Sequence, residues 1–248
     1  MLKHMTQPAQ IFITCIVDTL YPQVGEAVVR VLQRAGAQVD FPAGQTCCGQ
    51  PALNAGMRPE ARRMAEQTIR ILEHAAGPVV LPSGSCTGMI RHGYPELFAG
   101  DPEWQPRAKS LAERTYEFTE FLVDVLGVKD LAARYPGTLT YHPSCHLLRD
   151  LGVTQQPRAL LSAIEGAVLV ELPHGDECCG FGGLFSVEYA EISDAMLERK
   201  IANIESTGAD LVVSCDAGCI SNINGGLHRR RKQSPKAVHI AQILDQIP

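Results

Sequence analysis

The sequence predicts an α/β protein of two pseudo-repeated domains, each a small parallel sheet with flanking helices and cysteine loops at the carboxyl-terminal edge of the strands. Three observations predict this fold. One cysteine pattern occurs twice along the 248 residues. In each half, short β-type runs alternate with runs that have the apolar spacing of helices. The strand-like runs lead into cysteines, which places the polar chemistry in loops rather than within the elements.

The repeated pattern is a single cysteine, an adjacent pair followed by glycine, and one further cysteine. Eight of the nine cysteines belong to it. The separations between corresponding cysteines differ by only one or two residues between the halves, which chance placement rarely produces. The two copies are Cys15, Cys47-Cys48-Gly49 and Cys86, and then Cys145, Cys178-Cys179-Gly180 and Cys219. We therefore predict two domains, residues 1–126 and 127–248.

The first copy reads as strand, helix, strand, helix, strand. Its expected strands are residues 11–14, 38–41 and 78–81, and its expected helices are 25–35 and 59–75. The second copy has expected strands at 139–141, 167–172 and 210–213, and helices at 157–164 and 187–206. An amphipathic run at 111–126 and another at 238–247 each predict a closing helix packed on the sheet.

Strands that alternate with helices imply parallel sheets with right-handed crossovers. Every loop that follows a strand then lies on one edge of its sheet. The three cysteine loops of a copy can therefore converge, at the edge where open α/β folds bind their ligands.

Bulk properties exclude several classes of function. The formal charge of −5 and the pI near 5.9 provide no basic field for nucleic acid. No segment approaches the length of apolar sequence that a membrane span requires. We expect a cytoplasmic protein, where nine cysteines indicate metal binding or redox chemistry rather than a disulfide framework.

Thiolates are soft ligands that favour iron–sulfur clusters, zinc and Cu(I). Four of them can hold one [4Fe-4S] cluster, and adjacent cysteines can reach different metals of one cluster. We expect Cys15, Cys47, Cys48 and Cys86 to hold the first cluster, and Cys145, Cys178, Cys179 and Cys219 the second. Gly49 and Gly180 would let the backbone turn tightly, so that its N–H groups approach sulfide. The alternative to metal ligation is that these cysteines are buried, inert thiols.

The second copy has further candidates near its cysteines. Cys215 aligns with Pro82 of the first copy, so we expect a bystander, with alternative ligation as the other possibility. A histidine among thiolates can ligate a metal, donate a hydrogen bond to sulfur, or simply pack. We favour the last two roles for the histidines of this copy. They lie only in the second copy, so the two sites should differ in potential: His142, His146 and His174.

Four local strings resemble the cysteine-rich CCG domain: residues 46–52, 82–86, 141–145 and 178–183. That domain occurs in a cluster-binding component of heterodisulfide reductase, in the iron–sulfur subunit of glycolate oxidase and in the lactate utilization protein A family, which this chain resembles most in size. The reductase motif ends in Cys-x-x-Cys, whereas Met89 and Asn222 stand at that last position here. Each site therefore has four cysteines rather than five, which favours an ordinary [4Fe-4S] cluster over the non-cubane cluster of the reductase.

The resemblance to lactate utilization protein A implies an iron–sulfur electron-transfer subunit of a complex with two partner proteins, which together oxidise L-lactate to pyruvate. No dinucleotide fingerprint is present, so we assign no catalytic residue and expect a subunit that is not an enzyme by itself. Two alternatives stay open. One is a CCG-type thiol or disulfide reductase subunit, and the other is a zinc-stabilised assembly module without redox chemistry.

Overall fold

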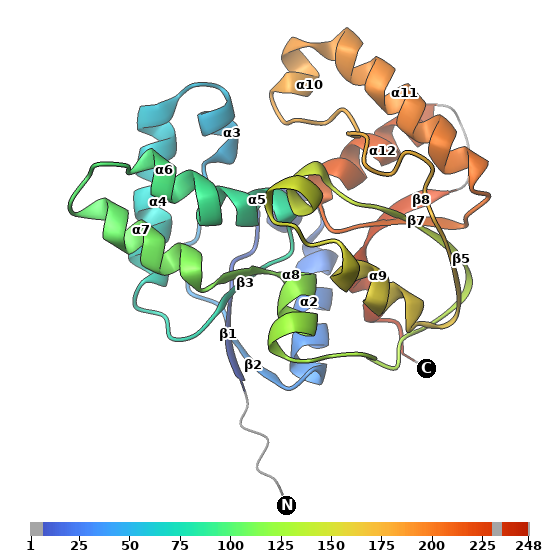
Figure 1. The fold of residues 1–248 in the computed structure, drawn as a ribbon, viewed down its shortest axis with the longest axis horizontal. Helices are drawn as coiled ribbons and strands as arrows, with labels where there is room; N and C mark the ends of the chain where they lie inside the picture. The colour runs from blue at the N-terminus through green and yellow to red at the C-terminus, as the bar shows by residue number, and fades with distance from the viewer. Residues whose placement is uncertain (1–6, 230–234, 248) are drawn as a thin grey trace, which may run out of the picture. The chain divides into compact units, whose positions relative to one another are not determined.

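The computed structural model describes residues 7–229 and 235–247. The chain divides into two compact units, residues 1–128 and 129–248. Each unit is built on a four-stranded parallel sheet. Figure 1 shows helices flanking the strands of each unit. The predicted fold class is therefore confirmed.

The first unit alternates strands and helices as far as its third strand. Its strands are β1 (Gln7–Ile11), β2 (Ala37–Asp40), β3 (Val79–Leu81) and β4 (Thr115–Glu117). Its helices are α1 (Cys15–Leu20), α2 (Pro22–Arg34), α3 (Gln50–Asn54), α4 (Arg58–Leu72), α5 (Gly84–Gly88), α6 (Tyr94–Leu97), α7 (Trp104–Glu113) and α8 (Phe118–Glu120), with π-helical turns η1 (Met89–Gly93) and η2 (Phe121–Val125).

The second unit repeats the order. Its strands are β5 (Arg134–His142), β6 (Glu165–Val170), β7 (Leu211–Ser214) and β8 (Lys236–His239). Its helices are α9 (Gln155–Ser162), α10 (Phe185–Glu188), α11 (Ala190–Ser206), α12 (Ala217–Arg229) and α13 (Ile240–Leu244), with the π-helical turn η3 (His146–Asp150).

The two sheets have the same topology. The strand orders are β2-β1-β3-β4 and β6-β5-β7-β8, with every neighbouring pair parallel. The first strand of each copy is therefore central, and the chain crosses to one side and then to the other. The carboxyl ends of all four strands of a unit lie on one edge, and the loops that leave this edge carry the cysteines.

The expected closing helices, 111–126 and 238–247, were wrong at residues 115–117 and 238–239, because each sheet has a fourth strand there. Residues 115–117 pair with β3, and 236–239 pair with β7. Residues 111–113 end α7, and the helices that follow the fourth strands begin at Phe118 and Ile240. The apolar spacing read from the sequence belongs to these later segments, where Phe118, Phe121 and Leu122 are buried. The upstream residues gain hydrogen bonds to an otherwise open sheet edge, which helical periodicity does not register.

The other predicted elements agree with the structure apart from shifts at their ends. The expected strand at residues 11–14 shares only Ile11 with β1, which spans Gln7–Ile11. The chain leaves the strand early because Thr14 already precedes α1 in an extended conformation and Cys15 opens that helix. Among the described residues, no helix is both long and apolar enough to cross a membrane.

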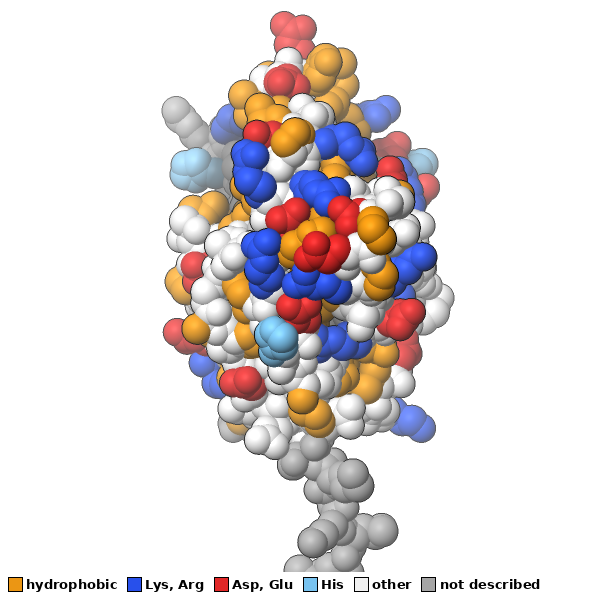
Figure 2. Space-filling model, turned by 90° about the vertical axis from the view of Figure 1, so that its left-hand side faces the viewer, with side chains coloured by type: hydrophobic (Ala, Val, Ile, Leu, Met, Phe, Trp, Pro, Cys, Tyr) orange, Lys and Arg blue, Asp and Glu red, His pale blue; other side chains and the backbone are white. Residues whose placement is uncertain are grey.

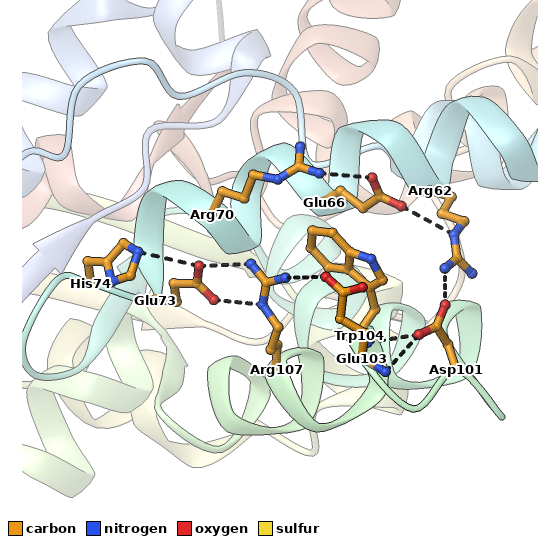
Figure 3. Close-up of polar contacts among 9 residues, drawn as sticks. All are labelled: Arg62, Glu66, Arg70, Glu73, His74, Asp101, Glu103, Trp104 and Arg107. Carbon is orange, nitrogen blue, oxygen red and sulfur yellow. Dashed lines mark hydrogen bonds and ion pairs between the residues drawn. The ribbon is translucent and has the colours of Figure 1, made fainter.

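A charged network joins α4 to α7 in the first unit (Figure 3). The Arg107 guanidinium donates two hydrogen bonds of 2.8 Å to the Glu73 carboxylate, and it lies 4.0 Å from the ring centroid of Trp104. Arg62 pairs with both Glu66 and Asp101. On the face of the molecule shown in Figure 2, basic and acidic side chains are interspersed rather than separated by sign. The ion pairs support the packing of α4 against α7. The described residues on the face in Figure 2 form no patch of charges of one sign.

Candidate metal centres

The first centre brings four cysteines together from three loops. Cys15 opens α1, the adjacent pair precedes α3, and Cys86 lies in α5. The Cys15 and Cys47 sulfurs are 3.6 Å apart, and those of Cys48 and Cys86 are 3.3 Å apart. Cys48 and Cys86 are buried, while the other two are partly exposed. The sulfurs thus form two close pairs at the edge where the sequence predicted convergence.

One thiolate in each centre is stabilised by its neighbours. Hydrogen bonding from the Cys15 thiol, and then from Cys48, lowers the pKa of Cys47 far below its ordinary value. The pKa of Cys178 is lowered in the same way, first by Cys145 and then by Cys179. A preformed thiolate is the state that ligates a soft metal.

The glycine after each cysteine pair is required by the backbone. Gly49 and Gly180 both adopt φ of 89°, in the left-handed region. A Cβ atom on Gly180 would lie 2.5 Å from the Ser193 carbonyl oxygen, and one on Gly49 would lie 3.2 Å from that of Ala61. The Gly180 N–H donates to the Cys178 sulfur at 3.3 Å. The turn therefore aims a backbone donor at a cysteine sulfur, while the expected approach of the backbone to inorganic sulfide stays a prediction.

The second centre repeats the first. Cys145 precedes η3, the pair Cys178-Cys179 follows β6, and Cys219 lies in the first turn of α12. Cys145 interacts with Cys178, and Cys179 with Cys219, which is the pairing of sulfurs seen in the first centre. Both sets of four predicted ligands are thus brought together. Their ligand roles stay predictions.

The three histidines of the second copy have different surroundings. His142 is fully buried at the end of β5, and neither ring nitrogen has a hydrogen-bond partner among the described residues. Burial lowers its pKa to about 3, and the nearby Lys200 charge acts in the same direction. His146 is half-exposed, and its Nδ1 lies 2.5 Å from the Asp150 carboxylate. His174 has an exposed side chain and offers its backbone carbonyl to the Lys200 ammonium at 2.9 Å.

Cys215 lies outside the group of four. Its side chain is fully buried, and its sulfur is 3.7 Å from the Tyr141 hydroxyl. The ring of Tyr141 lies against the Arg158 guanidinium of α9. The potential metal-binding group formed around His142 does not include Cys215. The bystander role of Cys215 stays a prediction.

Sequence reasoning missed Lys200. This residue of α11 is fully buried, and its ammonium donates to the carbonyls of His174 at 2.9 Å and Gly175 at 3.3 Å. Its charge acts on Cys179 and Cys145. Gly49 and Gly180 contact Met64 and Met196 of equivalent helices, and the same offset aligns Lys200 with Thr68. An alignment of the two helices would have revealed this residue, because it shows a lysine in the second copy where the first has a threonine.

The position of the absent fifth cysteine also has a role in the second copy. The Asn222 side-chain amide donates to the Cys179 carbonyl at 2.9 Å. In the first copy the Cys48 carbonyl instead accepts from the Tyr94 hydroxyl at 2.8 Å, while Met89 packs among buried apolar residues. Each cysteine pair is therefore held by one side-chain donor, contributed from a different position.

Comparison with known proteins shows which family the chain resembles. The CCG cysteine-rich domain model matches residues 9–91 and 139–224. Lactate utilization protein A 2 of Bacillus cereus (strain 03BB102) is 46% identical over 234 residues, 94% of this chain and 96% of that protein. The chain belongs to the lactate utilization protein A family. Lactate utilization protein A of Oceanobacillus iheyensis is 48% identical over 235 residues, 95% of each chain.

Among solved structures, aspartate racemase from Picrophilus torridus aligns over 96% of this chain and 91% of its own, with a TM-score of 0.39 and 7% identity. That similarity is too low to bear on function. For the lactate utilization protein A family member described here, function is instead argued from the two cysteine centres.

Proposed function

We propose that this chain is an iron–sulfur electron-transfer subunit of a multi-protein complex that oxidises L-lactate to pyruvate. Two other lactate-utilization proteins are its proposed partners. The proposed location is the cytoplasm, whose reducing conditions keep thiols available for metal. The name of the related proteins supports the substrate, and the donor chemistry of the two centres supports the cofactor.

One observation carries the proposal. Two independent sets of four thiols converge on the carboxyl-terminal edges of equivalent sheets, and in each set one thiolate is already stabilised by its neighbours. Four soft donors fit a [4Fe-4S] cluster, which would supply one-electron redox chemistry when bound. In this proposal Cys15, Cys47, Cys48 and Cys86 hold one cluster, and Cys145, Cys178, Cys179 and Cys219 hold the other.

The protein around each centre would hold and tune the cluster. Gly180 directs its N–H to the Cys178 sulfur, and hydrogen bonds of this kind stabilise negative charge on sulfur. Buried Cys48 and Cys179 exclude water from one side of each centre. Cys15 and Cys145 are partly exposed, which would give a redox partner access to each centre.

The test is the metal content of protein purified without oxygen. We expect about eight irons and eight acid-labile sulfides per chain, with the broad visible absorption of iron–sulfur proteins. Zinc without sulfide would instead support the assembly module, and turnover of a disulfide by purified protein with an artificial donor would support the reductase. Absence of iron and sulfide even after reconstitution would contradict the proposal.

The partners require a separate test. The tagged chain, expressed anaerobically with its two proposed partners, should co-purify with both and reduce an artificial acceptor when L-lactate is added. The chain alone should show no lactate-dependent reduction. Lactate oxidation by the two partners at an undiminished rate without this chain would exclude the electron-transfer role.

A further inference from the structure

Phe12 and His142 are equivalent residues in the two copies. Each lies three positions before the first cysteine of its centre, Cys15 or Cys145. Each is fully buried at the end of the central strand of its sheet. Phe12 continues the pairing of β1 with β3 through its N–H, and His142 pairs with Ser214 of β7. The two rings therefore lie at equivalent backbone positions of the two sheets.

Phe12 belongs to the same buried apolar cluster as Cys48 and Cys86. The corresponding cysteines of the second copy are Cys179 and Cys219, and a His142 ring nitrogen and their two sulfurs all lie within 4.8 Å of one another. One position thus holds a phenyl ring in the core cluster that includes two cysteines of the first centre, and an imidazole close to two sulfurs in the second.

The imidazole has the features of a ligand. Three atoms within 4.8 Å of one another lie within about 2.8 Å of a common point, close to the ~2.0–2.3 Å of metal–nitrogen and metal–sulfur bonds. Both nitrogens lack a partner among the described residues. A buried polar group left in this state costs on the order of 1–3 kcal/mol.

We propose that His142 is a direct metal ligand of the second centre, so that this centre offers five donors while the first offers four. The donors are one His142 ring nitrogen and the sulfurs of Cys145, Cys178, Cys179 and Cys219, so one iron of a [4Fe-4S] cluster in this centre would take the imidazole in addition to its thiolate. This proposal rests on the proposed function for the identity of the metal group. Imidazole is a good ligand for iron as well as zinc, and metal ligation satisfies a buried nitrogen that has no other partner among the described residues.

The experiment is pulsed electron paramagnetic resonance on the full chain, reconstituted with iron and sulfide, reduced with dithionite, and prepared with natural or nitrogen-15 histidine. We expect a strongly coupled nitrogen that changes with the histidine isotope. His142→Phe recreates the residue of the first copy and should abolish this coupling while the first centre keeps its spectrum. His146→Phe is the matched control, because His146 is adjacent to Cys145 but half-exposed, and it should leave the coupling unchanged.

The outcomes separate this proposal from the proposed function. Wild-type protein with full iron and sulfide but no strongly coupled histidine nitrogen, or with one that persists in His142→Phe, overturns His142 ligation and leaves the cluster assignment intact. Protein without iron and sulfide contradicts the proposed function instead. Ligation is then decided by cadmium-113 NMR of cadmium-loaded wild type and His142→Phe. A resonance that moves to an all-sulfur shift in the variant supports ligation, and identical spectra overturn it.

Discussion

Glu117 and His239 occupy the same position in the two halves of the chain. Each ends the fourth strand of its sheet, paired with Leu81 and Ser214 respectively, and each caps the helix that follows. The Glu117 carboxylate accepts from the Thr119 N–H at 2.7 Å, and the His239 Nδ1 accepts from the Ala241 N–H at 3.1 Å. Both side chains are fully buried. Two chemically different groups therefore perform one capping task.

The buried Glu117 carboxyl predicts a pH-dependent stability. Burial raises its pKa to about 7 from an ordinary 4.5. The contribution to stability is full below pH 4.5, where folded and unfolded chains are both protonated, and it is lost as the pH rises to about 7. The loss is on the order of 3 kcal/mol. The measurement is urea unfolding of metal-free, reduced protein. Between about pH 4.5 and about pH 7.5, the free energy of unfolding of Glu117→Gln should rise relative to that of wild type by this amount.

The control for this experiment is Glu113→Gln, which alters an exposed carboxylate at the end of α7. The free energy of unfolding of this variant should differ from that of wild type by a constant amount over the same pH range. A Glu117→Gln variant that also differed by a constant amount would show that the carboxyl is not protonated in the folded protein at neutral pH.

The two cysteine–glycine turns should differ in their tolerance of a side chain. Alanine at either position adds the strain of a positive φ, which costs roughly 1 kcal/mol. Gly180→Ala also places Cβ 2.5 Å from the Ser193 carbonyl, against 3.2 Å for Gly49→Ala and the Ala61 carbonyl. We expect Gly180→Ala to unfold at lower urea concentration than Gly49→Ala, and to lose iron from its own centre. Equal losses of stability would mean that α11 moves to accommodate the methyl group.

Cysteine substitutions should separate ligands from bystanders. Cys179→Ala removes one of four converging thiols, so we expect about half of the iron and sulfide to be lost, since one four-iron cluster should remain. Cys215→Ala should keep the full content, because Cys215 lies outside the repeated pattern of four cysteines and its sulfur contacts the Tyr141 hydroxyl. Equal iron loss in both variants would show that Cys215 is a ligand and that the last loops of the two copies are misaligned.

Lys200 should raise the reduction potential of the second centre. Its buried ammonium acts on Cys179 and Cys145, and a nearby positive charge stabilises the added electron. In a redox titration, Lys200→Met should lower the potential of one cluster and leave the other unchanged. Arg199→Met changes an exposed neighbour on the same helix and should alter neither. Unchanged potentials in Lys200→Met would mean that the His174 and Gly175 carbonyls neutralise the effect of the ammonium at the cluster.

The sequence by itself determined the duplication, the alternation of strands and helices, and the grouping of eight cysteines into two sets. These features are local or periodic, and parallel topology then directs every cysteine loop to one edge of its sheet. The fourth strands could not be predicted from the sequence, because residues 115–117 and 236–239 form short strands that are hydrogen-bonded only to β3 and β7.

Only the tertiary structure decided which side chains surround each centre. Lys200 is more than twenty residues from the nearest cysteine of its pair, and α11 must fold back on the Cys178-Cys179 turn before its ammonium reaches the His174 carbonyl. The histidines of the second copy were equivalent by sequence, yet one is buried among sulfurs and another pairs with Asp150. Burial and the absence of a partner among the described residues arise from contacts between distant segments, so no local pattern in the chain records them.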